Sequence, residues 1–162
     1  MKRSTAHVSR STIHLILTLS FVLLATGPAA WAGAKEEVAA AGAKWAELFV
    51  IDDPDPILAL YDDETGVLWG TLSPVRLDGK PGIRGYFERA FKALPGHKVA
   101  FGDQNIRVLG DTAVNTGYYT FSFTKDGEAK SLPARYSFTY VKRPWGWMIV
   151  DHHSSAMPAP PK

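Results

Sequence analysis

The hydrophobic positions of this 162-residue chain follow two different periods along its length. Across residues 34–51 and again across 83–94, apolar side chains recur every three or four positions, which predicts two amphipathic helices. Residues 52–56, which contain two prolines and three aspartates, end the first helix and cap a short helix predicted over 57–61. A first strand is predicted over 67–72.

After residue 97 the period changes to two, which is the spacing of β-strands. Four long strands are predicted, over residues 97–109, 112–125, 129–143 and 147–153. Tight turns separate them at Gly110-Asp111, Asp126-Gly127 and Pro144-Trp145-Gly146. Pro133 has no amide hydrogen to donate, so we expect a sheet edge or a bulge near it.

Helices come first and long antiparallel strands come last, which predicts an α+β fold. Aromatic strands of this length, packed on helices, are not expected to form a flat layer. We expect a cone-shaped, curved antiparallel sheet wrapped around three N-terminal helices, with a cavity between the sheet and the helices. No segment of about 20 to 50 residues repeats, which excludes solenoids and propellers.

The first 32 residues differ from the rest of the chain. They begin with three basic residues, continue with an apolar stretch over 13–25, and end with the small-x-small pattern Ala30-Trp31-Ala32. The apolar stretch is shorter than the roughly 20 residues that span a bilayer. We therefore expect a secretory signal peptide over 1–32, cleaved after Ala32, and a secreted or periplasmic protein. The alternative is an uncleaved N-terminal anchor.

Removing the signal peptide changes the charge balance. The remaining chain carries 15 basic and 16 acidic residues, a net charge of about −1 with histidine neutral. It has no basic stripe, so neither nucleic acid nor, after cleavage, a membrane is an expected partner. The absence of cysteine excludes disulfides and thiolate sites. We expect one domain over 33–158 that relies on its apolar core, followed by a disordered tail over 159–162.

Residues able to perform chemistry gather at the end of the last strand, where Asp151, His152, His153 and Ser154 are consecutive. Strict alternation places Asp151 and His153 on one face, with Trp147 and Ile149, and places His152 and Ser154 on the other. Asp151 could orient the imidazole of His153 for proton transfer near neutral pH, so His153 and His152 are candidate general bases. The alternative is that one histidine caps the strand end and the other packs at a subunit interface. No third ligand is suitably spaced, so no metal site is predicted.

Several motifs resemble the nuclear transport factor 2-like (SnoaL-like) superfamily. The generic ones are Asp53-Pro54-Asp55, Ile57–Tyr61, Val67-Leu68-Trp69 and Pro81–Phe87. Two more specific segments, Ala134–Tyr140 and Trp147–Pro158, look like one branch of the superfamily. That branch comprises bacterial relatives of the association (hub) domain of calcium/calmodulin-dependent protein kinase II, some of them labelled SgcJ/EcaC-type oxidoreductases. The resemblance covers nearly the whole chain after the signal peptide.

The resemblance implies a cystatin-like α+β barrel with a pocket, assembled as a homodimer or a larger ring. It implies no particular activity, because the superfamily includes isomerases, dehydratases, cyclases, ligand-binding modules and assembly domains. No glycine-rich phosphate or dinucleotide loop is present, so no cofactor is predicted. The paired carboxyl groups of steroid isomerases also have no convincing counterpart on the predicted strands.

The resemblance also suggests ligand contacts. Hub-domain relatives carry pocket arginines, which makes Arg135 the candidate contact for a small carboxylate. The alternative for Arg135 is a surface ion pair. Tyr119 and Tyr140 could donate hydrogen bonds to a ligand oxygen, and Trp69 is assigned to the pocket wall.

Together these features predict a secreted domain that self-associates and binds a small polar or carboxylate molecule in its pocket. Two alternatives stay open. One is an enzyme of the dehydratase or isomerase kind that uses a histidine base, and the other is a pure oligomerisation module.

Overall fold

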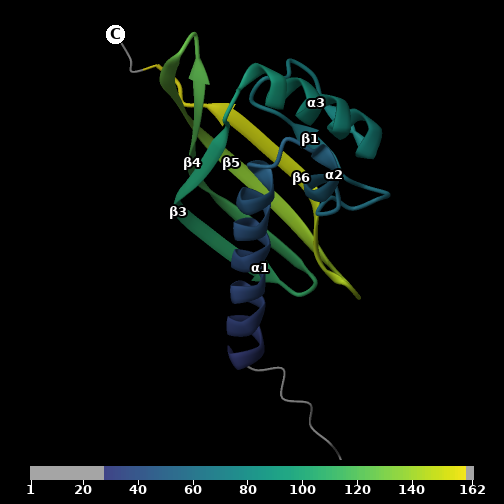
Figure 1. The fold of residues 1–162 in the computed structure, drawn as a ribbon. Coiled ribbons are helices and arrows are strands. Elements are labelled where there is room, and N and C mark those ends of the chain that lie inside the picture. Colours follow the sequence, from purple (N-terminus) through teal and green to yellow (C-terminus); the bar gives the residue numbers. More distant parts are fainter. Residues whose placement is uncertain (1–27, 160–162) are drawn as a thin grey trace, which may run out of the picture.

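Six strands form one bent, open sheet that curves around the long helix α1 in the computed structural model (Figure 1). Residues 28–159 are described, with side chains from residue 33 onward. The helices are α1 (Pro28–Phe49), α2 (Pro54–Leu58) and α3 (Gly79–Ala93), and the strands are β1 (Val67–Trp69), β2 (Leu77–Asp78), β3 (Lys98–Leu109), β4 (Thr112–Lys125), β5 (Glu128–Arg143) and β6 (Gly146–Ala156). The predicted α+β cone is confirmed.

The predicted signal peptide lies mostly outside the described residues, and so does most of the predicted tail. The last five residues of the predicted signal peptide, 28–32, form the start of α1. This helix therefore begins earlier than the helix expected over 34–51. Among the described helices, none has both the length and the apolar character needed to cross a membrane.

The strand order is β2-β1-β6-β5-β4-β3. Strands β3 to β6 pair antiparallel with their neighbours in sequence, as predicted. Strand β1 instead runs parallel to β6, so the prediction of a wholly antiparallel sheet is wrong at this end. The chain between β1 and β6 includes α3 and four strands, which is long enough for the crossover that parallel pairing requires.

The turns of the long hairpins follow from their residues. Asp126 and Gly127 both have positive φ, at 54° and 78°, which is the backbone of a type I′ hairpin turn. Strand β5 continues through Pro133 without a bulge, so that alternative was wrong. Pro133 lies one residue beyond the last β5–β6 pair, Ala134 with Ala156, where β5 no longer has β6 beside it.

Helix α1 fills the concave side of the sheet because its apolar stripe faces inward. Val38, Trp45 and Phe49 are each at most 3% exposed. The carboxylate of Glu37 accepts a hydrogen bond from Trp147 Nε1 at 2.9 Å and pairs with Lys142. Helix α1 therefore contacts the sheet through its buried apolar side chains and through the polar contacts of Glu37 with β5 and β6.

A bulge in β6 decides which of its residues face inward. The register with β5 shifts between Ile149 and Asp151, which leaves Val150 as the additional residue. The inward-facing, buried side chains are consequently Trp147 and Ile149 before the bulge, and His152 and Ser154 after it. The predicted grouping of Ile149 with His153 is therefore wrong, because strict alternation does not hold across a bulge.

The turn after α2 is fixed by a buried carboxylate. Asp62 Oδ2 accepts from Arg143 Nε at 2.8 Å, and Oδ1 accepts from the Thr65 hydroxyl at 2.8 Å and the Thr65 amide at 3.1 Å. These donors, Arg143 foremost, lower the pKa of Asp62 to about 2. This turn is thereby tied to the end of β5.

Candidate functional site

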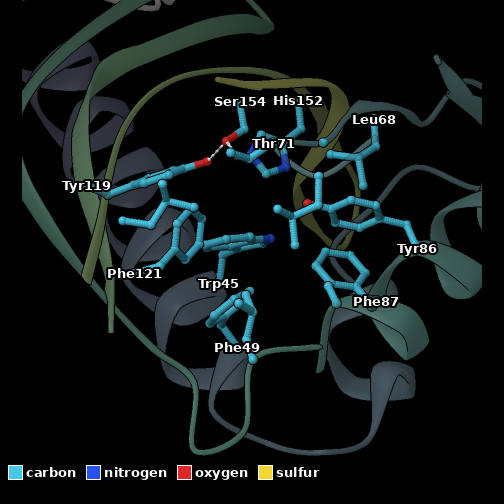
Figure 2. Close-up of a pocket in the computed structure, with 15 residues that line it drawn as sticks. Trp45, Phe49, Leu68, Thr71, Tyr86, Phe87, Tyr119, Phe121, His152 and Ser154 are labelled. Carbon is cyan, nitrogen blue, oxygen red and sulfur yellow. Dashed lines mark hydrogen bonds between the residues drawn. The ribbon is translucent and has the colours of Figure 1, made fainter. Parts of the chain in front are cut away.

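A small cavity lies beside α1, between the concave face of the sheet, the segment that follows β1, and α3. Its volume is about 20 Å³, which is room for about one water molecule. Figure 2 shows Tyr119, Ser154, Thr71 and His152 together on one side, with the rings of Trp45 and Phe49 and the side chains of Leu68, Tyr86 and Phe87 around the rest. Gly70, Leu72, Ala90, Leu94, Phe121 and Leu132 complete the lining.

None of the fifteen lining residues is Asp, Glu, Lys or Arg. The polar groups are the imidazole of His152 and the hydroxyls of Thr71, Tyr86, Tyr119 and Ser154. The site is therefore an apolar chamber with a few neutral hydrogen-bonding groups.

The ring of His152 is oriented by two residues from the helical part of the chain. Its Nδ1 lies 2.8 Å from the Tyr61 hydroxyl, and Trp45 Nε1 donates to the same hydroxyl at 3.3 Å. An indole N–H can only donate, so the Tyr61 oxygen accepts from Trp45 and its hydrogen is free to donate to Nδ1. With the imidazole proton on Nε2 the Tyr61 hydrogen has an acceptor, whereas with the proton on Nδ1 it would be left buried without one, so the Nε2–H tautomer is favoured.

His152 is 2% exposed, and its Nε2 has no hydrogen-bond partner among the described residues. Burial, with a smaller contribution from the neighbouring His153, lowers the pKa of His152 to about 3. The ring is therefore neutral at physiological pH and presents an N–H. A group with such a low pKa is a weak general base at pH 7.

Three hydroxyl groups form a second polar group in the wall. Tyr119 donates to Ser154 Oγ, which also contacts the hydroxyl of Thr71. Burial raises the pKa of Tyr119 far above its ordinary value, although its hydrogen bond to Ser154 partly offsets the rise. Tyr119 is therefore a neutral donor whose hydrogen is already used within the wall.

Tyr86 closes one side of the cavity. Its ring lies directly against Gly70, where a Cβ atom would overlap the ring. Burial raises the pKa of Tyr86, while the backbone amides of Leu72 and Thr71 act in the opposite direction. Only glycine at position 70 allows this closed arrangement.

Four of the residues predicted for the site lie outside this cavity. Alternation and the bulge place Asp151, His153, Arg135 and Trp69 on the outer, convex face. There Arg135 Nε donates to Ser155 Oγ at 3.1 Å, and Trp69 pairs with His153 in register. None of the four therefore lines the cavity beside α1, but Arg135 lines a separate, more open hollow with Asp103, Tyr118 and Tyr136.

The other predicted residues face inward. His152 and Tyr119 line the cavity, whereas Tyr140 is buried elsewhere on the concave face. The hydroxyl of Tyr140 has no partner among the described residues. It lies near the position that a Cβ atom of Gly42 would occupy, together with the side chain of Asn115.

Sequence reasoning missed Tyr61, Thr71 and Tyr86 as parts of the site. Tyr61 is 91 positions from His152, so no local spacing connects the two. The parallel β1–β6 pairing, together with a backbone bridge between Tyr61 and Ile149, brings these segments together. Within residues 28–159, no three His, Asp or Glu side chains gather as a metal site.

Comparisons with known proteins agree with this architecture. The family model for the calcium/calmodulin dependent protein kinase II association domain matches residues 34–158. A Xanthomonas campestris protein, described as a candidate association domain of this kind, is 37% identical. Its structure covers 75% of this chain and 86% of its own, with a TM-score of 0.69.

More distant structures share the fold. An NTF2-like protein with a cystatin-like fold from Novosphingobium aromaticivorans is 19% identical over 80% of this chain and 85% of its own, with a TM-score of 0.68. A candidate dehydratase of the NTF2-like family from Streptomyces avermitilis is 18% identical over 77% and 96%, with a TM-score of 0.69. No curated protein matches the sequence.

Proposed function

The chain belongs to the calcium/calmodulin dependent protein kinase II association domain family, and on this basis we propose that it self-associates through the outer face of its sheet. The observation that supports this proposal is the exposure of large aromatic residues on that face. Tyr118 is 54% exposed and Trp69 is 43% exposed. Exposed aromatic side chains of this size are enriched at protein–protein interfaces.

The outer face between these two residues is continuous. Tyr118 pairs with Arg135 and then Ser155 across β4, β5 and β6, and the adjacent row runs from Ser137 through His153 to Trp69. Its mixed aromatic and polar character suits an isologous homodimer, in which the same patch of two subunits meets. Sedimentation equilibrium of the wild type tests this proposal: a mass of at least two subunits is expected, and a monomer at every concentration contradicts it.

A second proposed function is the binding of a small molecule in the cavity. It is supported by the buried N–H of His152, because a buried donor without a partner is costly and invites an acceptor. The cavity holds about one water, so a larger occupant requires Tyr86 or Leu72 to move aside.

Thermal-shift screening with a library of uncharged small molecules tests the second function. A bound molecule stabilises the folded state by mass action. Ala90→Leu fills the cavity from α3, and Ala93→Leu adds the same side chain at an exposed position of the same helix. At least one compound should raise the Tm of the wild type and of Ala93→Leu but not that of Ala90→Leu. Equal shifts in all three proteins contradict a site in this cavity.

We favour binding over acid–base catalysis. The histidine inside the cavity has a pKa of about 3, and the Asp151–His153 pair lies on the outer face. Turnover of a carbonyl or hydroxy compound that is lost in both His152→Gln and Ala90→Leu would instead support the enzyme alternative.

We also propose that the protein is exported, on the evidence of the N-terminal sequence pattern alone. N-terminal sequencing of protein recovered from the periplasm or the medium should begin at Gly33. Recovery of the intact chain from the cytoplasm contradicts export.

A further inference from the structure

One buried hydrogen-bond donor beside the cavity has no partner among the described residues. Trp45 and Tyr61 hold the imidazole of His152 with its proton on Nε2, and this nitrogen is buried without a partner. Tyr119 and Thr71 both contact Ser154, so two of these three hydroxyl hydrogens are used within the wall. The Nε2–H of His152 is the buried donor whose missing acceptor an occupant would supply.

The lining also restricts the charge of an occupant. An anionic group in the cavity would lose its hydration water without gaining a cationic partner, because no Lys or Arg lines the cavity. Arg135, the predicted carboxylate contact, lies on the opposite face of the sheet. A cation would likewise find no carboxylate.

An uncharged carbonyl oxygen suits these conditions best. It accepts one hydrogen bond from an N–H without requiring a donor in return. The aromatic and aliphatic walls, including Phe87, Phe121 and Leu68, would cover the apolar body attached to it.

We propose that the cavity selects small uncharged carbonyl compounds, namely ketones, aldehydes or amides, whose oxygen accepts the Nε2–H of His152. The inference rests on the proposed small-molecule site. Entry of a compound larger than water would require Tyr86 or Leu72 to move aside, and a shift of the Tyr86 ring away from Gly70 would enlarge the cavity.

Three probes of similar shape separate the possibilities: cyclopentanone, cyclopentane and cyclopentanecarboxylate. Their dissociation constants are measured on the wild-type protein by NMR, with the ring ¹⁵N–¹H signal of His152 as a direct readout. Cyclopentanone should bind about tenfold more tightly than cyclopentane and should shift the Nε2–H signal in a saturable way. Cyclopentanecarboxylate should bind more weakly than cyclopentanone.

Variants then test the donor itself. His152→Phe keeps a ring but removes the N–H, and it should abolish the preference for cyclopentanone over cyclopentane. Tyr140→Phe is the control, because it removes a buried hydroxyl, unpaired among the described residues, that lies outside the cavity. It should retain the preference for cyclopentanone. The wild-type readout does not depend on either variant folding.

Each other outcome contradicts the inference. Equal affinity for cyclopentanone and cyclopentane overturns the role of His152 but leaves the small-molecule site standing. Tighter binding of the carboxylate overturns the selection of uncharged compounds. Failure of all three probes to bind overturns both the inference and the small-molecule site, while the proposal of self-association is unaffected.

Discussion

At the scale of single residues, keeping His152 neutral should lower the stability of the folded protein at acidic pH. Its pKa is about 3 in the folded protein, against an ordinary value of 6.5. Between these values the unfolded chain binds a proton that the folded protein does not. The free energy of unfolding should therefore fall as the pH is lowered from about 6.5, by up to ~1.4 kcal/mol per pH unit.

Urea unfolding of the wild type and His152→Gln between about pH 4.5 and 7 measures this dependence. The variant should lose most of the slope. His153→Gln, which removes the exposed imidazole next to it, should keep the wild-type slope. A wild-type slope in His152→Gln would show that the buried ring takes up its proton without unfolding.

Sequence reasoning at this scale found the right stretch and kept both histidines as candidates. The sequence Asp151-His152-His153-Ser154 is dense in reactive groups, and alternation correctly separates the two rings. It could not show which ring faces inward, because the additional residue at Val150 is not marked by glycine or proline. A bulge of this kind is set by pairing with β5, which is a tertiary property.

At the scale of elements, Gly70 and Tyr86 couple the segment after β1 to α3. A Cβ atom at position 70 would overlap the Tyr86 ring, so Gly70→Ala should destabilise the protein by about 1–3 kcal/mol. In a Tyr86→Ala background the same substitution should cost little. A double-mutant cycle by urea unfolding should give a coupling of at least about 1 kcal/mol.

Gly102→Ala is the matched control for this cycle. A Cβ atom there would lie 3.5 Å from the Tyr118 carbonyl oxygen, which is ordinary contact. Its cost should be the same with Tyr86 or Ala at position 86. Additive costs for Gly70→Ala and Tyr86→Ala would mean that the ring does not occupy this seat in solution.

A second prediction at this scale concerns the turn that Asp62 fixes. Its pKa is about 2, against an ordinary value of 3.8, chiefly because Arg143 donates to it. The stabilisation is therefore complete above about pH 4 and is lost as the pH falls toward 2. Because Arg143 is partly exposed and screened, we expect on the order of 1–2 kcal/mol.

Asp62→Asn should lower the free energy of unfolding by this amount at pH 7, and the difference from wild type should shrink at pH 3. Asp63→Asn removes the adjacent, exposed carboxylate and should have little effect at either pH. If Asp62→Asn is as stable as the wild type at pH 7, the ion pair does not stabilise the turn.

Elements with a strong local pattern were predictable. The period of two and the Asp-Gly turn located β4 and its hairpin with β5, because both signals are local. The parallel β1–β6 pairing and the two-residue strand β2 were not predictable. They depend on contacts between segments roughly 80 and 10 residues apart, and β2 is too short to show a period.

At the scale of the whole molecule, the family resemblance and the physical pattern lead to the same cone. The chain belongs to an association-domain family, and the exposed aromatic residues of the outer face support the proposal that two copies meet there. The residues first assigned to a pocket, Arg135, Asp151 and His153, belong to that face. They were chosen for their chemistry, and the same chemistry suits a polar interface.

A charge placed in this face should therefore prevent assembly. Trp69→Lys introduces a cation at the end of the row formed with His153 and Ser137, where two copies would bring it into a desolvated contact. Sedimentation velocity should show a weakening of self-association by at least tenfold, with an unchanged melting temperature of the isolated subunit. Trp145→Lys makes the same substitution at a 72% exposed tryptophan in the β5–β6 turn, and it should assemble like the wild type. If both variants dissociate, or neither does, the outer face near Trp69 is not the interface.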